Sequence, residues 1–202
     1  MNGLVVSGNY IHDNLGKGLW SDGDNFNLVF ENNRIINNQY NGINHELSFN
    51  AIIRNNDIEG NGFGVLSTTA LEGSGIELSN SCCTEIYGNT IKGNRDGIGL
   101  VQFNRPPGPN GAYITHDVSI HDNTIGLAGN AYNGMIQWVS DGSFYSSKNN
   151  SFSHNTYLLG CVTTSTPFLW QDPTSPNLVS YLTPTQWRAE NQDPTGTFSN
   201  NG

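Results

Sequence analysis

The sequence predicts an all-β fold, a solenoid of about six coils in which short parallel strands stack on one another. Three observations predict it. One motif recurs every 23 to 34 residues, apolar and polar residues alternate over three to five positions, and no stretch keeps a helical apolar period. Strands this short cannot enclose a core alone, so each must pair with its copies in the coils above and below.

The first half of each repeat carries apolar residues at fixed distances from two asparagines. The copies read VSGNYIHDN from Val6, FENNRIINN from Phe30, IRNNDIEGN from Ile53, IYGNTIKGN from Ile86, IHDNTIGLAGN from Ile120 and SKNNSFSHN from Ser147. Asparagine tolerates unusual backbone angles and bonds its own main chain, so it suits a tight bend between strands. Six such bends predict a column of amides, each bonded to the next, formed by Asn9, Asn33, Asn56, Asn89, Asn123 and Asn150.

The second half of each repeat begins with a glycine and continues as a short strand. These glycines are Gly18, Gly42, Gly75, Gly97 and Gly134. Strand alternation predicts that the first and third residues after each glycine point into the coil. These are Leu19, Ser21, Ile43, His45, Ile76, Leu78, Ile98, Leu100, Met135 and Gln137. The second and fourth should point outward, namely Trp20, Asp22, Asn44, Glu46, Glu77, Ser79, Gly99, Val101, Ile136 and Trp138.

Two insertions break the period, and a tail follows the last repeat. Residues 62–73 and 103–117 form the insertions, which we expect to wall a groove on one side of the solenoid. The repeats occupy residues 1–157, and residues 158–202, rich in Thr, Pro, Ser and Trp, are expected to cap the last coil. In this cap, Thr183 and Pro184 should begin a short helix. The aromatic residues expected to lie over the last coil are Phe168, Trp170, Tyr181 and Trp187.

These repeats resemble the right-handed parallel β-helix proteins of the pectate-lyase-like superfamily over roughly residues 3 to 157. The tail is similar to the C-terminal tails of bacterial secreted β-helix proteins. The resemblance implies a right-handed coil, in agreement with the general preference for right-handed crossovers. It also implies an extracellular or cell-surface location, although the sequence shows no signal peptide.

Charge and composition exclude several classes of partner. The net charge is −9 with only eight Lys and Arg, which argues against nucleic acid and anionic membrane surfaces. No apolar stretch reaches the length of a membrane span.

No helical segment covers the first coil, so we expect either a truncated N-terminus or stacking with another chain there. Cys82, Cys83 and Cys161 form no metal pattern and are expected to pack as small apolar groups, with a Cys161 bridge left open.

Three carboxylates fall on the outward face of successive coils. Asp22 and Glu46 share a register, about 5 Å apart, whereas Glu77 lies one coil and two residues from Glu46, roughly 8 Å away. Pairs of carboxyl groups at such distances catalyse glycoside hydrolysis. Alternatively, Asp22, Asp24 and Glu46 hold calcium, or all are solvated surface residues. Like charges at one coil spacing repel, which favours a cation or a proton between them.

The neighbouring side chains extend this candidate site. Trp20 offers a flat surface for a sugar ring, and Asn44, His45 and Trp138 are further candidates for substrate binding. His45 is equally a core residue by alternation. His12, His116 and His121 share no register and are interpreted as surface or turn residues. Arg105, on the Pro-rich second insertion, is a candidate base for a polysaccharide lyase, which the resemblance implies, or an ion-pair anchor.

The sequence therefore predicts a carbohydrate-active protein that binds and cleaves a polysaccharide along its outward face, as a hydrolase or a lyase. No cofactor other than calcium is expected. The alternative is a non-catalytic carbohydrate-binding or structural surface module.

Overall fold

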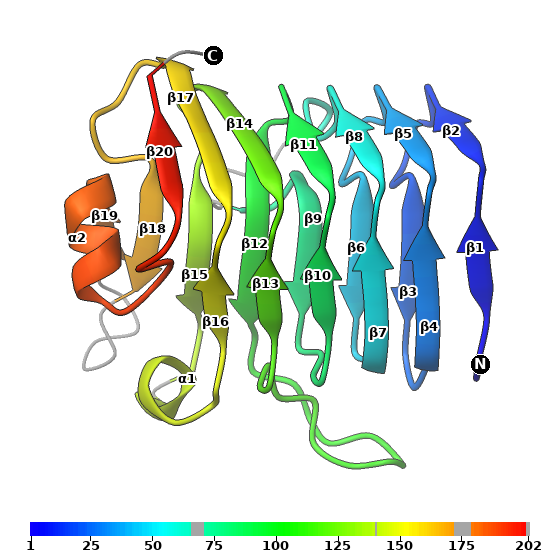
Figure 1. The fold of residues 1–202 in the computed structure, drawn as a ribbon. Helices are drawn as coiled ribbons and strands as arrows, with labels where there is room; N and C mark the ends of the chain where they lie inside the picture. The colour runs from blue at the N-terminus through cyan, green and yellow to red at the C-terminus, as the bar shows by residue number, and fades with distance from the viewer. Residues whose placement is uncertain (66–70, 140, 172–178, 201–202) are drawn as a thin grey trace.

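Three β-sheets run side by side along the molecule (Figure 1). The computed structural model describes residues 1–65, 71–139, 141–171 and 179–200. Sheet A contains β1 (Val5–Ser7), β4 (Phe26–Glu31), β7 (Phe49–Arg54), β10 (Glu85–Tyr87), β13 (Ser119–His121) and β16 (Ser151–Ser153). Sheet B contains β2 (Tyr10–His12), β5 (Arg34–Ile36), β8 (Asp57–Glu59), β11 (Thr90–Lys92), β14 (Thr124–Gly129), β17 (Thr156–Val162) and β20 (Thr197–Ser199). Sheet C contains β3 (Leu19–Asp22), β6 (Ile43–Glu46), β9 (Ser74–Ser79), β12 (Asp96–Gln102), β15 (Asn133–Gln137), β18 (Phe168–Gln171) and β19 (Val179–Leu182).

The chain visits the three sheets in turn, so that each circuit adds one strand to each sheet. Neighbouring strands are parallel except β18 and β19, which pair antiparallel within the tail. The described residues also include two helices, α1 (Ser143–Ser146) and α2 (Pro184–Ala189). The predicted fold class, an all-β solenoid of about six coils, is confirmed.

Stacked apolar side chains fill the inside of the coils. Each strand contributes residues that lie in register with their copies, for example Ile43 with Ile76 and Ile76 with Ile98. These three are fully buried, and burying one such side chain stabilises the fold by about 1.5–3 kcal/mol. Gly42 is required where two coils approach closely, because a Cβ there would lie 2.6 Å from the backbone oxygen of Gly75. The predicted inward residues are buried, apart from a half-buried Leu19 in the first coil.

The predicted outward residues lie on the outer face of sheet C, but beyond the first coil most of them are covered, and Trp138 is an exposed exception. Trp20 and Asp22 are exposed, but Asn44, Glu77 and Val101 are buried on the outer face of sheet C. A second apolar cluster covers part of this face and consists of Leu71, Val101, Ile136 and Leu169. Alternation correctly gives the side of the sheet on which a residue lies, but it cannot show that an insertion covers that side.

An asparagine column runs through the turns between sheets A and B. The Asn33 side chain donates to Asn56 Oδ1 at 3.0 Å, and the same bond repeats along the column to Asn89, Asn123 and Asn155. The last position was predicted as Asn150 and is Asn155, because Ser119 pairs with Ser151 and Thr124 with Thr156. The residue before each column asparagine adopts the left-handed conformation, namely Gly8, Asn32, Asn55, Gly88, Asp122 and His154. The column residue therefore supplies the bonds, and its predecessor supplies the bend.

A second, shorter asparagine column follows sheet B. Asn14 donates to Asn38, Asn38 to Asn61 and Asn61 to Asn94, at 2.7–2.8 Å between amide nitrogen and oxygen. These are the second asparagines of the motif. Both asparagines of the repeat are thus structural.

Replacing Asn56 with alanine is expected to lower the free energy of unfolding by about 2–4 kcal/mol. Asn56 donates to Asn89 Oδ1 and to the Phe30 carbonyl, both at 2.9 Å, and accepts from Asn33 N and Nδ2, both at 3.0 Å. Urea unfolding measures the loss. Alanine at the exposed Asn104 is the matched control and should change stability by less than about 0.5 kcal/mol. Equal effects at the two sites would contradict a stabilising column.

The tail closes the far end of the solenoid. Thr183 caps α2 in a capping box with Gln186, as the sequence predicts for Thr183 and Pro184. Trp187, Phe168 and Trp170 are buried in the core cluster, whereas Tyr181 is 50% exposed and packs on Tyr132. Strand β20 pairs with β17, so the tail returns to sheet B. Residues 172–178 of this predicted cap lie outside the described residues.

The three cysteines have free thiols. Cys82 is buried, in agreement with the prediction, but Cys83 and Cys161 are exposed, so the expectation of apolar packing is wrong for both. Among the helices that the structure describes, none is both long and apolar enough to cross a membrane.

Candidate functional site: an acidic cleft on the outer face of sheet C

A cleft of about 380 Å³ opens on the outer face of sheet C. Glu46, at the end of β6, and Glu77, within β9, lie in it together with Asn44. The first insertion contributes Val65, Glu72 and Gly73, and the second contributes Phe103 and Arg105. Both insertions therefore wall the cleft as expected from the sequence, although residues 66–70 of the first lie outside the described residues. Lys17, Tyr40 and Asn41 complete the lining.

The second insertion reaches the cleft by folding back along the solenoid. Figure 1 shows this green segment between β12 and β13 extending beneath the preceding coils. The Tyr113 hydroxyl donates to Asp24 Oδ2 at 2.9 Å, and Asn110 Nδ2 donates to Asp24 Oδ1 at 3.1 Å. The Arg105 guanidinium lies 3.2 Å from Glu46 Oε1. Asp24 in the first coil thus anchors a segment that starts in the fourth.

Glu46 is surrounded by groups that favour a negative charge. Besides Arg105, Lys17 Nζ lies 3.6 Å from Glu46 Oε2, and the indole nitrogen of Trp20 donates to the same oxygen at 3.3 Å. Asp22 shares the register of Glu46, as predicted. Burial and the nearby Glu46 raise the pKa of the Asp22 carboxyl, while Lys17 and Arg105 partly oppose that shift. Lys17 and Arg105 therefore supply positive charge beside this pair of carboxylates.

Glu77 lies in a different environment on the floor of the same cleft. It is only 4% exposed, and burial raises the pKa of its carboxyl to about 7. Asn41 Nδ2 donates to Glu77 Oε2 at 2.7 Å. Asn44 pairs with Glu77 in register, and its buried Oδ1 has no hydrogen-bond partner. A carboxyl with a raised pKa and an unused acceptor thus lie one coil apart, about 4.8 Å along the solenoid.

The structure does not bring together the carboxylates predicted to hold calcium. Asp22 pairs with Glu46, but both oxygens of Asp24 accept hydrogen bonds from the second insertion. The ligand atoms of Asp22, Asp24 and Glu46 do not all lie within 4.8 Å of one another. Calcium binding by this trio stays a prediction.

The remaining candidates are dispersed. Trp20 is 59% exposed beside Glu46, with Lys17 Nζ 4.2 Å from the ring centroid, so one face of the indole is covered. His45 points into the coil, where its Nδ1 lies 2.7 Å from Ser21 Oγ, and burial lowers its pKa to about 4. Trp138 follows β15, three strands from β6 in sheet C, and does not line the cleft. His45 and Trp138 are therefore not part of this cleft.

Sequence reasoning missed Lys17, Asn41 and Glu72. Lys17 and Asn41 directly precede Gly18 and Gly42, so the signal was a polar residue before the coil glycine. Strand alternation predicts that the residue before the coil glycine points into the coil. The chain is still turning at this position and has not yet entered the strand, and the side chains of Lys17 and Asn41 line the cleft instead. Glu72 lies in an insertion, and no periodic signal could have placed it.

Parallel strands stacked coil on coil, with asparagine columns at the turns, define a parallel β-helix repeat protein. Residues 1–71, about a third of the chain, match the sequence model of the right handed beta helix region. The chain is a right-handed parallel β-helix repeat protein. Comparison with curated proteins and with solved structures finds no match.

Proposed function

We propose that this protein is an extracellular carbohydrate-active enzyme that hydrolyses a polysaccharide bound in the acidic cleft. One observation carries the proposal. Glu77, with a pKa of about 7, shares a cleft with the charge-paired Glu46. Two carboxyl groups whose environments differ in this way are the usual acid and base of glycoside hydrolysis.

In this mechanism Glu77 protonates the leaving oxygen, and Glu46 activates the attacking water. One coil and two residues separate them, roughly 8 Å, within the range of about 6.5–9.5 Å that leaves room for a water and inverts the anomeric centre. The unpaired Asn44 Oδ1 is positioned to accept a sugar hydroxyl, and the free face of Trp20 supports a ring. Arg105 pairs with Glu46, which favours a positioning role over that of a lyase base.

A panel of neutral and anionic polysaccharides, assayed with and without calcium, tests the proposal. New reducing ends without the ultraviolet absorbance of an unsaturated uronide would support hydrolysis. That absorbance would mean β-elimination and would shift the catalytic assignment to Arg105 and a pectate-lyase-like mechanism. No cleavage across the panel would contradict the enzyme proposal.

Replacing Glu46 with glutamine is expected to lower turnover by about 100- to 10,000-fold, because it removes the general base. The assay is the release of reducing ends, with circular dichroism to confirm the fold. Glu59→Gln is the matched control, since Glu59 is a carboxylate of sheet B that pairs with Lys92 at 3.8 Å. It should retain full activity. Retained activity in Glu46→Gln would contradict the assignment.

A non-catalytic module is the second candidate, and the exposed face of the first coil favours it. Val6, Ile11 and Leu19 point into the first coil but are only half-buried, and the outward Val5, Tyr10 and Trp20 beside them are between 55% and 59% exposed. Unpaired strand edges beside such residues can accept a strand from another chain. Association that increases with concentration in sedimentation equilibrium, and that Val5→Lys abolishes, would support stacking at this end.

A further inference from the structure

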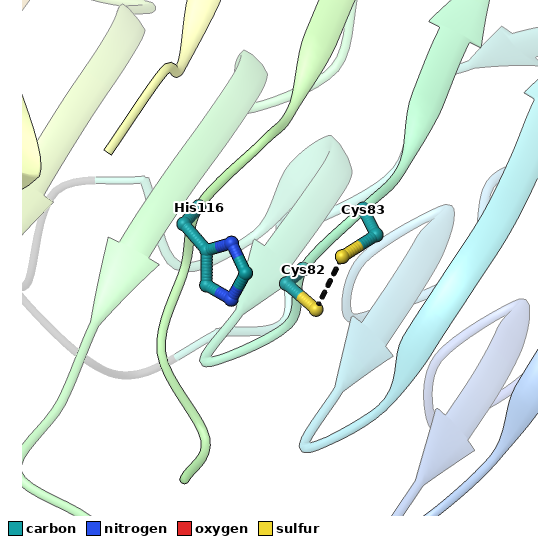
Figure 2. Close-up of side chains that lie close together, drawn as sticks. All are labelled: Cys82, Cys83 and His116. Atoms are coloured by element: carbon teal, nitrogen blue, oxygen red, sulfur yellow. Dashed lines mark hydrogen bonds between the residues drawn. The ribbon is translucent and has the colours of Figure 1, made fainter. Parts of the chain in front are cut away.

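Two cysteines and a histidine from neighbouring coils meet near one corner of the solenoid. Cys82 and Cys83 lie in the turn between β9 and β10, and His116 lies at the end of the second insertion, before β13. Figure 2 shows the two sulfurs beside each other and the imidazole next to Cys82. One ligand atom from each residue lies within 4.8 Å of the others, and the two sulfurs are 2.8 Å apart. This group lies outside the acidic cleft.

The register of sheet A explains why these residues meet. Glu85 pairs with Ser119, so Cys82 is level with His116 and Cys83 is level with Asp117, one coil apart. The backbone is already fixed at this spacing, because Cys83 N donates to the His116 carbonyl at 2.9 Å. On the other side, Asn50 N donates to the Cys82 carbonyl at 3.0 Å. The two thiols and the imidazole are therefore positioned by the coils themselves.

Cys83 occupies a backbone conformation that cysteine rarely adopts. Its φ is +59°, and the equivalent residues of the other coils also have positive φ. Those residues are Asn27, Asn50, Asp117 and Asn149. Asparagine and aspartate tolerate this region, whereas a cysteine there is an outlier of the kind found at functional sites. A structural turn alone would be better served by asparagine, so the thiol itself needs an explanation.

His116 is oriented in the way that metal-binding histidines usually are. Its Nδ1 lies 2.6 Å from Asp117 Oδ2, and Asn149 Nδ2 donates to Asp117 Oδ1 at 2.9 Å. With Nδ1 donating to the carboxylate, Nε2 is left as the acceptor for a metal. Asp117 in turn is held by Asn149, so two successive residues fix the tautomer and the ring orientation.

We propose that Cys82, Cys83 and His116 bind a zinc ion through two thiolates and the imidazole Nε2. Two sulfurs and one nitrogen suit zinc, and a water would fill the fourth position on the solvent side of Cys83. In a tetrahedral site with Zn–S distances of about 2.3 Å the sulfurs lie ~3.8 Å apart, so they must separate by ~1 Å on binding. The two thiol protons leave to solvent.

Such an ion would fasten the end of the second insertion to the preceding coil. His116 ends the segment whose other residues contact Glu46 and Asp24, so zinc would restrain a wall of the acidic cleft without touching a substrate there. The proposal does not depend on the cleft being catalytic.

Titration of the reduced full-length protein with Co²⁺, a spectroscopic probe for zinc, tests the proposal. We expect one equivalent to bind with thiolate-to-cobalt charge-transfer absorption that zinc abolishes. Cys83→Ser and His116→Gln should each weaken cobalt binding at least ~10-fold. This is the smallest loss of metal affinity that is typical even for residues that only contact a metal ligand. The matched controls are Cys161→Ser and His121→Gln, because Cys161 is a free thiol elsewhere and His121 has an Asp122 partner but no nearby cysteine pair.

Two results would overturn the proposal. One is the absence of the thiolate absorption in the reduced wild-type protein. This result counts against the proposal whether or not Cys82 and Cys83 form a disulfide before reduction. The other is unchanged cobalt affinity in Cys83→Ser and His116→Gln, with circular dichroism showing an intact fold in both variants.

Discussion

Replacing Glu77 with glutamine is expected to lower turnover by at least two orders of magnitude and, at pH 8, to stabilise the fold. The buried Glu77 carboxyl is the proposed acid, and loss of a general acid lowers rates by about 100- to 10,000-fold. Glutamine keeps the shape and can still accept the hydrogen bond that Asn41 donates to Glu77 Oε2. The fold should therefore persist, and the loss of activity can be assigned to the missing proton.

The stability change follows from the raised pKa of Glu77. In the unfolded chain the carboxyl has its usual pKa of 4.5, whereas burial raises it to about 7 in the fold. The contribution of the Glu77 carboxyl to the free energy of unfolding is fully present below pH 4.5 and is lost as pH rises through about 7. The shift corresponds to about 3 kcal/mol at pH 8, which glutamine would recover. As an acid, Glu77 must be protonated, so wild-type activity should also fall as pH rises through about 7.

Urea unfolding of wild type and Glu77→Gln at pH 4.5 and pH 8 measures the stability difference, and reducing-end release measures activity. The comparison must be made between variants, because burial lowers the pKa of His45 to about 4 and raises that of Asp96 to about 7, and both groups add their own pH dependence. Glu59→Gln is again the matched control and should change neither quantity. A Glu77→Gln variant that keeps its activity while gaining stability at pH 8 would show that the raised pKa has no catalytic use.

The repeat made the inside of the solenoid predictable. Strand alternation places Ile43, Ile76 and Ile98 inside, and the register follows from the fixed distance to each asparagine. The ladder bonds between Asn33 and Asn56 follow from the same spacing. The local residue pattern and the stacking of the coils favour the same structure at these positions, so the sequence alone is enough to predict it.

The outer face was less predictable because it depends on segments that break the period. Glu46 and Glu77 were recognised as candidates, but that Glu77 is buried follows from how the two insertions fold over sheet C. The meeting of Arg105 with Glu46 spans 59 residues, and that of Tyr113 with Asp24 spans 89. No local rule encodes such contacts.

The register of the last repeat was also mispredicted. Phe152 pairs with Ile120, so the sixth copy of the repeat begins at Phe152 and not at Ser147, and its column asparagine is Asn155 and not Asn150. The proposed thiol–imidazole group was missed for a related reason, because His116 lies 33 residues from Cys83 and only the coil register brings them together.

The second large effect is expected where the main asparagine column ends, at Asp193. This residue is fully buried in the tail and takes the place of a further asparagine. Its Oδ2 accepts from Asn155 Nδ2 at 2.7 Å and from the Tyr157 hydroxyl at 2.8 Å. Asn155 N also donates to the carboxylate at 3.3 Å. Alanine here would leave these donors unpaired in the core, and we expect a loss of about 3–5 kcal/mol in the free energy of unfolding.

Asparagine at position 193 distinguishes a lost hydrogen-bond acceptor from a lost charge. An amide oxygen can accept both bonds from Asn155, as the other column residues do, so Asp193→Asn should cost much less than Asp193→Ala. Alanine at Asp57, an exposed carboxylate 3.7 Å from Arg34, is the control and should cost less than about 1 kcal/mol. Urea unfolding measures all three variants.

The part of the solenoid that loses stability in Asp193→Ala is as informative as the size of the loss. In a solenoid each coil is stabilised chiefly by its neighbours, so an unpaired end should open first. Amide hydrogen exchange in Asp193→Ala should therefore accelerate in β16, β17 and β20 while β5 and β8 remain protected. Uniform acceleration along the chain would mean that the coils unfold together, in which case Asp193 stabilises the whole solenoid and not only its last turn.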